Sequence, residues 1–592
     1  MYPNLSVSFV DMYLRETKRR NRDGSEVAYL ALAHNERDPD TGTPKARIVH
    51  NFGRADEIDR DALTRLVRSI SRFLDPVEVS ATAAAQADGV DVPAVVDSRP
   101  MGVAWVADQL WRRLGIADAI VKAAHGRRVD GELVERVLFA MVANRLTHRP
   151  LSKLAGCKWV AERVFIDGLD AVSDDACYRA MDFFLDALAE LQQTVFFSVA
   201  NLLNLEVDLL FFDTTSTFWQ TETADDALLA DPGDAADGDA ADGDDDAGRA
   251  VEAATRTWGH SKDHRPDLPQ VVIGMAVTRE GIPVRLWTFP GDTSDQTLIR
   301  TVKDDLRSWQ LHRVVWVLDR GFASETNRRY LQRGGGSYII GEKLRGASHE
   351  GAAALARQGR YHTVAGNLRV KQVRVDDDLG DRFVICHNPD RARRDAEIRA
   401  QIVARLQEAI AGSDALGARA RAELAGRLKT KPTFNRFLRA TPTGKLRIDR
   451  TAVRRDAHYD GKYLLRTPNQ TLTPDDIAQA YKALYEAERG WRDLKTVQIN
   501  LRPVFHHTDA RIQAHVQLCW LALLLLRVAE VGVGDTWRNI RDELDRLHLV
   551  TLATGDGQVA QRGELRPRQR AILGALGLPQ PPRFFDFTPT SG

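Results

Sequence analysis

The sequence predicts an α/β protein whose central domain is built on a sheet of buried strands, preceded by a small β-rich unit and a helical domain. Two apolar runs, residues 209–213 and 314–319, are rich in Val, Leu and aromatic residues, as strands buried on both faces are. Each run ends in an aspartate. A third segment, residues 473–495, has the apolar spacing of an amphipathic helix. Strands alternating with helices are typical of α/β folds.

The two apolar runs each deliver a carboxylate, Asp213 and Asp319, to the place where the strand is expected to end. Ligands of open α/β sheets bind beyond the carboxyl ends of the strands. Glu488 on the later helix is the third candidate. Three ionised carboxylates about 5 Å apart repel by roughly 3 kcal/mol per pair at an effective dielectric of about 20, and a bound cation reverses that cost. Oxygen ligands favour Mg²⁺ or Mn²⁺ over Zn²⁺, and two such ions about 4 Å apart support phosphodiester transfer.

The later helix is predicted to begin at an N-cap threonine, Thr473, with Pro474 at its first position. Residues spaced seven apart share one face of a helix. One such line is apolar and would seat the helix on the sheet, and a second line is polar: Ile477, Leu484 and Trp491, and Tyr481, Glu488 and Lys495. The polar line places Glu488 where it can face the two aspartates.

A purely structural interpretation of the same residues is also open. Aspartate often terminates a strand or caps a turn, and Glu488 with Arg492 has the i,i+4 spacing of a surface ion pair. Both aspartates together with the helix favour the metal site.

These residues resemble the DDE transposases of bacterial insertion sequences, in the superfamily of insertion sequence 4. Phe-Asp213-Thr-Thr-Ser and Leu-Asp319-Arg-Gly-Phe are similar to the first two acidic motifs of that group. The third motif is Tyr-x2-Arg-x3-Glu-x6-Lys, and the chain has Tyr481, Glu488 and Lys495 at this spacing, with Leu484 in place of the arginine. Segments 259–270 (GHSKDHRPDLPQ) and 290–295 (PGDTSD) are similar to the 1634-type group of the superfamily.

The resemblance implies a transposase that binds the ends of its insertion sequence, cleaves the DNA and joins the freed 3′-OH to target DNA. Catalytic residues and ligands of two Mg²⁺ or Mn²⁺ ions would be Asp213, Asp319 and Glu488. Its partners would be the inverted-repeat DNA ends, target DNA and a second protomer in a synaptic homodimer. The residues expected to contact DNA are Tyr481, Arg489, Arg492, Lys495 and Arg320; Arg489 and Arg492 are also candidates for the role of the missing arginine.

The order of elements agrees with an RNase H-like core. Strands are expected up to Asp213 and at 271–278 and 284–289, then a helix at 294–309, the strand ending at Asp319, a helix at 324–332 and a strand at 337–341. This β-β-β-α-β-α-β order places the two aspartates on the first and fourth strands, which parallel pairing and right-handed crossover bring side by side.

The remaining sequence predicts further domains around this core. Residues 1–75 form a β-rich unit with strands at 7–15, 27–34 and 46–52 and a basic turn at 18–22 suited to DNA phosphates. The following segments are a linker at 76–100, a helical domain at 101–203 that binds DNA ends through basic stretches such as 145–153, core at 204–341, an insertion at 342–472, core at 473–531 and a C-terminal unit at 532–592. The insertion is expected to have strands at 361–375, 382–387, 445–448 and 463–466 and a helical stretch at 392–438, and by the resemblance it helps hold DNA at the active site.

The formal net charge of zero conceals an uneven distribution. Residues 225–246 contain ten Asp and no Lys or Arg, so a disordered acidic insertion is expected at about 224–248. Without that stretch the chain carries about ten positive charges, which is compatible with a nucleic-acid partner.

No membrane segment is expected. The longest apolar run, residues 516–526, is about half the roughly twenty residues that a bilayer requires. The four cysteines, Cys157, Cys177, Cys386 and Cys519, are too dispersed for a zinc module and too few for a disulfide framework. We therefore expect a cytoplasmic bacterial protein, associated with the nucleoid when DNA-bound.

Three other functions remain open at this point. Another RNase H-like nuclease, such as a resolvase or exonuclease, would share the carboxylates without joining strands. A DNA-binding relative would keep the fold without catalysis, and an α/β metal phosphatase would use similar ligands. Terminal inverted repeats flanking the coding DNA would distinguish the transposase from all three.

Overall fold

The computed structural model describes residues 12–20, 26–37, 44–56, 58–59, 93–203, 205, 207–219, 255–309, 311, 314–375, 380–502, 504, 506, 508–554 and 557–589. The chain divides into two compact units, Met1–Pro93 and Ala94–Gly592. The acidic insertion expected at 224–248 lies outside the described residues, as does most of the expected linker. Strands and helices alternate in the second unit, which confirms the predicted α/β class.

The first unit is a three-stranded antiparallel sheet in the order β1-β2-β3. Its strands are β1 (Met12–Arg20), β2 (Glu26–Arg37) and β3 (Pro44–Arg54). All three predicted strands are present; the first, expected at 7–15, continues to Arg20, and residues 7–11 are outside the described part. The expected basic turn at 18–22 was wrong for Lys18, Arg19 and Arg20, which continue β1 and pair with β2. The side chains of this stretch are all exposed, and pairing with β2 as far as Arg20 opposite Glu26 continues the strand.

The second unit begins with a strand and six helices. The strand β4 (Ala94–Pro100) pairs with a C-terminal strand, so the predicted linker was wrong at residues 94–100. The helices lie where a helical region was expected at 101–203: α3 (Gly102–Arg113), α4 (Ile116–Ala124), α5 (Gly131–Arg145), α6 (Lys153–Arg163), α7 (Asp174–Asp186) and α8 (Leu188–Leu202). Asp130, Ser152 and Ser173 cap α5, α6 and α7 through their side chains.

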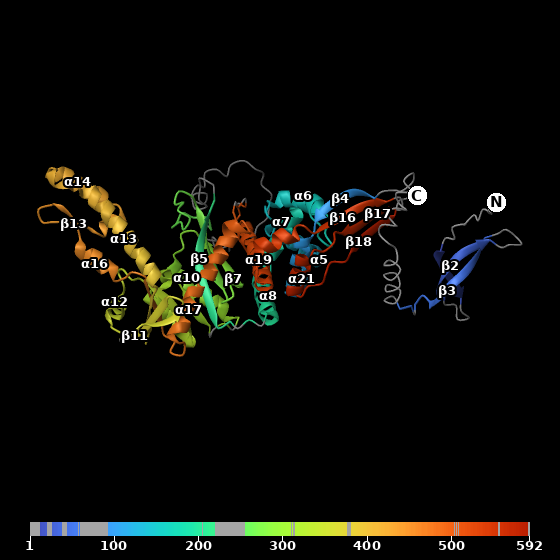
Figure 1. The fold of residues 1–592 in the computed structure, drawn as a ribbon, viewed down its shortest axis with the longest axis horizontal. Coiled ribbons are helices and arrows are strands. Elements are labelled where there is room, and N and C mark those ends of the chain that lie inside the picture. The colour runs from blue at the N-terminus through green and yellow to red at the C-terminus, as the bar shows by residue number, and fades with distance from the viewer. Residues whose placement is uncertain are drawn as a thin grey trace, which may run out of the picture. The chain divides into compact units, whose positions relative to one another are not determined.

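A nine-stranded sheet forms the centre of the second unit (Figure 1). In spatial order its strands are β10 (His362–Ala365), β11 (Leu368–Arg374), β12 (Arg382–His387), β15 (Lys462–Thr467), β9 (Ser337–Glu342), β8 (Val315–Leu318), β5 (Leu209–Phe218), β6 (Gln270–Val277) and β7 (Pro283–Pro290). The neighbours β5, β8 and β9 run parallel, and the other pairs are antiparallel. The segment predicted as one strand at 361–375 is two strands, because a turn at Gly366 with positive φ separates them.

Apolar residues on both faces of the central strands explain why these runs are strands. On β5, Leu210 and Phe212 pack with α10 (Asp295–Arg307) and α11 (Glu325–Gln332) on one face. Leu209 and Phe211 belong to the other core, with α19 (Asp509–Val533). Side chains alternate along a strand, so Asp213 shares the face of Phe211.

Three helices follow the last strand of the sheet. Helix α17 (Pro474–Ala483) begins with a capping box between Thr473 and Asp476, which confirms the predicted N-cap. The predicted helix is divided at Leu484, where the main-chain nitrogen bonds Tyr481 three residues back although the backbone stays helical; α18 (Tyr485–Arg492) follows, and the chain then forms a π-helical turn at Asp493–Val497. One helix of the described residues, α19, is long and apolar enough to cross a membrane, and most of it is buried inside the protein, as predicted for a core helix.

The insertion extends the sheet and carries a helical arm. We use the name arm for residues 389–457, which contain α13 (Pro389–Ile410), α14 (Ala418–Lys429), α15 (Pro432–Asn435), β13 (Leu438–Ala440), β14 (Leu446–Ile448) and α16 (Arg450–Ala457). The arm has its own small core around Leu406 and Phe437. A further helix, α12 (His349–Ala356), precedes β10.

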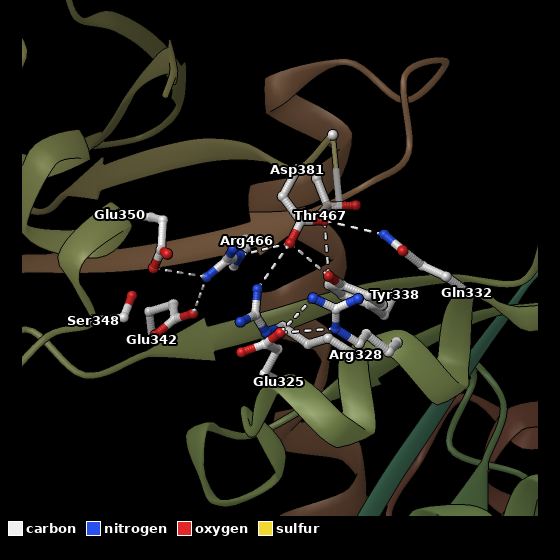
Figure 2. Close-up of polar contacts among 12 residues, drawn as sticks. Glu325, Arg328, Gln332, Tyr338, Glu342, Ser348, Glu350, Asp381, Arg466 and Thr467 are labelled. Carbon is white, nitrogen blue, oxygen red and sulfur yellow. Dashed lines mark hydrogen bonds and ion pairs between the residues drawn. The ribbon is translucent and has the colours of Figure 1, made fainter. Parts of the chain in front are cut away.

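A buried group of charges joins the insertion to the core sheet (Figure 2). The side chain of Asp381, next to β12, accepts hydrogen bonds from Arg466 on β15 (2.6 Å), Arg328 on α11 (3.1 Å) and Tyr338 on β9 (2.7 Å). Arg466 also lies 3.4 Å from Glu342. We call these five residues the Asp381 cluster. Because each of its acids has a cationic partner, the cluster fixes strands β12 and β15 against the core.

The C-terminal unit packs on the helical region. Its helices α20 (Trp537–Leu544) and α21 (Pro567–Ala575) accompany a four-stranded sheet in the order β18-β17-β16-β4, with β16 (His548–Thr554), β17 (Gly557–Arg562) and β18 (Phe584–Pro589). The main chain between residues 94 and 100 is therefore held by the far end of the sequence.

Candidate active site

The strand register brings Asp213 and Asp319 together. In the parallel ladder of β5 and β8, Phe212 is the partner of Leu318, and the next residue on each strand is the aspartate. The prediction that Asp213 ends its strand was wrong, since β5 continues to Phe218 by pairing with β6. Asp213 instead marks the point where the parallel ladder ends. Asp319 follows directly after β8, as predicted.

The surroundings of Asp213 favour its protonated form. Burial raises its pKa to about 6, and the nearby charges of Asp319 and Asp295 act in the same direction. The ammonium of Lys262 opposes them. Asp213 and Asp319 therefore interact electrostatically, together with a third carboxylate, Asp295, that was not predicted as a site residue.

Lys262 and Asp295 bond each other, and both bond Thr214, the residue that follows Asp213. The Lys262 ammonium donates to the main-chain oxygen of Thr214 (3.0 Å), to its hydroxyl, and to both oxygens of Asp295 (3.2 and 3.0 Å). The Thr214 hydroxyl donates to Asp295 at 2.5 Å. Asp295 is the first residue of α10, and a side chain at Gly321, in the turn after Asp319, would lie 3.4 Å from its carboxylate. Asp295 therefore lies close to both acidic motifs, the one that contains Asp213 and the one that contains Asp319.

Tyr481 on α17 holds Asp319 in place. Its hydroxyl donates to the Asp319 carboxylate at 3.0 Å, and its ring stacks on Tyr463 of β15 at a centroid distance of 5.9 Å. A Cβ at Gly341 would lie 2.2 Å from the Tyr481 hydroxyl, so only glycine leaves room for it. Burial and the charges of Asp319 and Glu488 raise the pKa of Tyr481. The phenol therefore remains a hydrogen-bond donor to Asp319 at neutral pH.

Glu488 lies exposed on α18, which packs on β5 and β6. A Cβ at Gly490 would lie 2.7 Å from Met275 of β6, so glycine allows the helix to approach the sheet closely. Within the described part of the chain, no three His, Cys, Asp or Glu side chains lie close enough to hold one metal ion together. The structure pairs the two aspartates and places Glu488 on the neighbouring helix, without assembling the three carboxylates around one point.

The other predicted helix residues divide into bound and exposed side chains. Lys495 is buried and bonds Asp263 of segment 259–270 at 2.9 Å, and Arg502 bonds the same carboxylate at 3.2 Å. Arg489 is held by Glu530 of α19 at 2.6 Å. Arg492 is exposed and donates to the hydroxyl of Tyr485 at 3.3 Å. Leu484, which replaces the arginine of the expected motif, is buried between α17 and α18.

A groove of about 1000 Å³ runs from Asp319 and Tyr481 to the arm. Arg320 lies in it and is exposed. Eight cationic and five acidic side chains line the groove, and the cationic ones are Arg320, Lys343, Arg345, Arg391, Arg399, Arg436, Lys462 and Lys482. Residues 391–460, which include most of the arm, contain 17 Lys and Arg against 8 Asp and Glu. This basic stretch sits in a chain of zero net charge.

Most of these groove residues were not predicted from the sequence as DNA contacts. The excess of Lys and Arg over residues 391–460 was the signal that could have indicated them. Lys262, Asp263 and Asp295 were noticed only within motifs similar to a family, without a role. By contrast, two residues of the predicted basic stretch 145–153, Arg145 and Lys153, are buried, so they do not form a DNA-contacting surface. Their charges alone could not show that they would be buried.

Comparisons with known proteins identify the family. Residues 14–83 match the model described as IS1634 family transposase, N-terminal domain, and residues 216–525 match the transposase DDE domain. The second match covers more than half of the chain and contains Asp319 and Glu488, while Asp213 lies three residues before it. No curated protein matches the chain.

Among solved structures, the chain is similar to a cryo-EM structure of the piggyBac transposase synaptic complex with hairpin DNA. The identity is 10%, the TM-score is 0.33, and the alignment covers 77% of this chain and 82% of the other. That similarity is too low to transfer residues or a mechanism. The family models are sufficient on their own: the chain belongs to the DDE transposases, in the IS1634 group.

Proposed function

We propose that this transposase binds the inverted-repeat ends of its insertion sequence, cleaves the DNA and joins the 3′-OH ends to target DNA by metal-dependent phosphodiester transfer. The observation that carries the proposal is the β5–β8 register, which sets Asp213 and Asp319 side by side at the end of the parallel ladder. The family supports the reaction class, and cut-and-paste transposition in the bacterial cytoplasm is the form of the reaction that we infer.

An RNase H-like core is part of this proposal. The strands β7-β6-β5-β8-β9 give the chain order 3-2-1-4-5, with the first three antiparallel and the last two added in parallel. The first and fourth strands of this set carry Asp213 and Asp319. The order supports an RNase H-like arrangement in which the insertion continues the sheet from its fifth strand through β15.

The donor atoms fit a hard divalent cation. Asp213, Asp319, Asp295 and the Thr214 main chain offer only oxygen ligands, which suit Mg²⁺ or Mn²⁺. We propose Asp213, Asp319 and Glu488 as the ligands of two ions, with Glu488 completing the set when α18 moves toward the aspartates. The ions would supply Lewis-acid stabilisation of the attacking and leaving oxygens.

The protein's own side chains would position these carboxylates and the DNA. Tyr481 fixes the orientation of Asp319 through its 3.0 Å hydrogen bond. The cationic groove leads DNA phosphates toward Asp319, with Arg320 at the site itself. Arg492 is placed for a further phosphate contact, and Arg489 and Lys495 would contribute after release from their acidic partners. Two protomers would bring two DNA ends together.

The test of cleavage uses duplex DNA from the sequence that flanks the coding region. Asp319→Asn removes one charge and preserves the shape of the side chain. We expect it to reduce Mg²⁺-dependent cleavage by about three orders of magnitude, since several kcal/mol of metal-assisted stabilisation are lost. Binding of the same duplex by gel shift should stay close to that of the unmodified protein. Equal losses of binding and cleavage would show that Asp319 is structural.

A second assay separates a transposase from a nuclease. DNA ends supplied already cut, with a free 3′-OH, should become joined to a supercoiled plasmid in the presence of Mg²⁺. A simple RNase H-like nuclease would cut the duplex and leave the plasmid unjoined, and a non-catalytic DNA-binding relative would do neither.

A further inference from the structure

The Lys262 ammonium occupies a site built of oxygen atoms. Four oxygens from two residues surround it: the main-chain and hydroxyl oxygens of Thr214 and both carboxylate oxygens of Asp295. These are the donor atoms that a divalent cation would also select. The site adjoins Asp213, whose charged form Lys262 stabilises.

The loop that carries Lys262 is fixed at several points. The Lys262 main-chain nitrogen donates to the Ser216 hydroxyl at 2.9 Å, which ties the loop to β5. The next residue, Asp263, bonds Lys495 from the π-helical turn after α18. A Cβ at Gly259 would lie 2.0 Å from the main-chain oxygen of Gly291, so the loop also packs tightly on the segment leading to Asp295. These contacts fix the loop, so Lys262 is not a freely moving surface side chain.

We propose that Lys262 is a built-in counter-ion of the carboxylate site. In the metal-free protein its ammonium neutralises Asp295 and reduces the negative potential at Asp213. Divalent ions must overcome this positive charge when they bind, so Lys262 is a positioning residue that sets metal affinity. The inference rests on the proposed metal-dependent function and extends it to the segment GHSKDH, residues 259–264.

The direction of the effect follows from electrostatics. A positive charge a few ångströms from a doubly charged ion opposes its binding, even at the high effective dielectric of a partly exposed site. The Lys262 side chain is 32% exposed, so the opposition is partly screened. Removing the charge should tighten Mn²⁺ binding by roughly fivefold. It should also destabilise the metal-free protein, because Asp295 loses its cationic partner.

The experiment measures Mn²⁺ binding to the DNA-free, full-length protein by calorimetry and its thermal unfolding with and without Mn²⁺. Lys262→Gln keeps a hydrogen-bond donor and removes the charge. We expect about fivefold tighter Mn²⁺ binding, a lower unfolding temperature without metal, and a larger increase on adding Mn²⁺ than in the unmodified protein. Lys262→Arg retains the charge and should bind Mn²⁺ within twofold of the unmodified protein.

Lys303→Gln is the matched control. The Lys303 ammonium bonds three main-chain oxygens, of Tyr330, Leu331 and Arg333, in the same domain. Its removal should lower the unfolding temperature equally with and without Mn²⁺. If Lys262→Gln is unfolded in metal-free buffer, recovery of the folded state on adding Mn²⁺ supports the proposal, and failure to recover at saturating Mn²⁺ overturns it.

The remaining outcomes separate this inference from the proposed function. Unchanged or weaker Mn²⁺ binding by Lys262→Gln, in a protein whose Mn²⁺ binding is lost on Asp213→Asn, overturns the counter-ion role alone. Mn²⁺ binding that is insensitive to Asp213→Asn would instead overturn the metal site of the proposed function.

Discussion

Two groups of charges on the same sheet differ in how completely the protein neutralises them. In the Asp381 cluster the Asp381 side chain is fully buried, and Arg328 and Arg466 are 7% and 1% exposed. Each acid there has an arginine within 4 Å. At the candidate active site, Lys262 bonds Asp295 and lies near Asp213, and Arg320 follows Asp319, so three carboxylates face two cations, and the site opens into a groove.

The difference indicates what each group is for. A buried acid with two arginines and a tyrosine has all its hydrogen bonds inside the protein, so it fixes the position of strands. Carboxylates that outnumber the nearby cations retain a demand for positive charge, which metal ions can meet. Charge balance, more than the number of charged residues, separates the structural group from the functional one.

The largest expected effect is at the balanced cluster. Asp381→Ala leaves Arg328 and Arg466 buried without their shared acid, and such a loss costs about 3–5 kcal/mol of unfolding free energy. Urea unfolding followed by circular dichroism measures it. Replacing Asp186, an exposed aspartate at the end of α7, by alanine is the matched control and should change stability by less than about 0.5 kcal/mol. A cost below about 1 kcal/mol for Asp381→Ala would remove the contrast between the two groups.

The next effect tests a third group, in which cations predominate. Lys153 donates to Nδ1 of His515 at 2.7 Å, and burial, followed by the charge of Arg145, lowers the Lys153 pKa to about 7. Between pH 7 and about 10 the unfolded chain keeps the lysine proton that the folded chain has released. Stability therefore rises with pH through that window, by up to about 1.4 kcal/mol per pH unit. Below pH 7 both states are protonated and the contribution is constant.

The measurement compares urea unfolding of Lys153→Met with that of the unmodified protein from pH 7 to 10. The stability of the unmodified protein relative to the variant should increase across this range. Lys122→Met, at an exposed lysine of α4, should follow the unmodified protein at every pH. Parallel curves for Lys153→Met would mean that Lys153 is charged in the folded protein, like an exposed lysine.

The sequence predicted where the central strands lie better than it predicted the long-range contacts between their side chains. The apolar runs of β5 and β8 and the cap at Thr473 are local signals, and the structure confirms them. The Asp381 cluster joins residues up to 138 positions apart, from Arg328 to Arg466, and no local pattern indicates such a meeting. The division of the helix at Leu484 was missed because the heptad spacing on either side continues through it.

The same limit applies to the candidate site. The register of β5 and β8 follows from the order of strands, so the pairing of Asp213 with Asp319 could be expected. The approach of Lys262 to Asp295 depends on how one loop folds over the sheet, which residue types alone do not determine. Whether Glu488, Tyr481 and the arginines of α18 act as expected remains a prediction.

A smaller effect is expected at the unbalanced site. Asp319→Asn removes one of the mutually repelling carboxylates and keeps the bond from Tyr481 possible. In metal-free buffer we expect stability to rise by up to about 1 kcal/mol, the scale of a partly screened charge interaction. Urea unfolding in the presence of EDTA measures it. If Asp319→Asn instead lost several kcal/mol of unfolding free energy, Asp319 would be a structural acid like Asp381, and the two groups would not differ in the way proposed.

The smallest effect concerns Lys495, which has features of both the structural and the functional charges. It is buried and paired with Asp263, as a structural cation is, yet it was predicted to contact a DNA phosphate. If a phosphate replaces Asp263 when DNA binds, Lys495→Ala should lower the slope of log affinity against log salt by about one unit. Asp263→Asn frees the lysine and should leave that slope unchanged, which makes it the matched variant. Fluorescence anisotropy of labelled end DNA at four salt concentrations gives both slopes. If Lys495→Ala leaves the slope unchanged and lowers the unfolding temperature, this lysine is structural. It would then hold the loop at 259–270 through Asp263 whether or not DNA is bound.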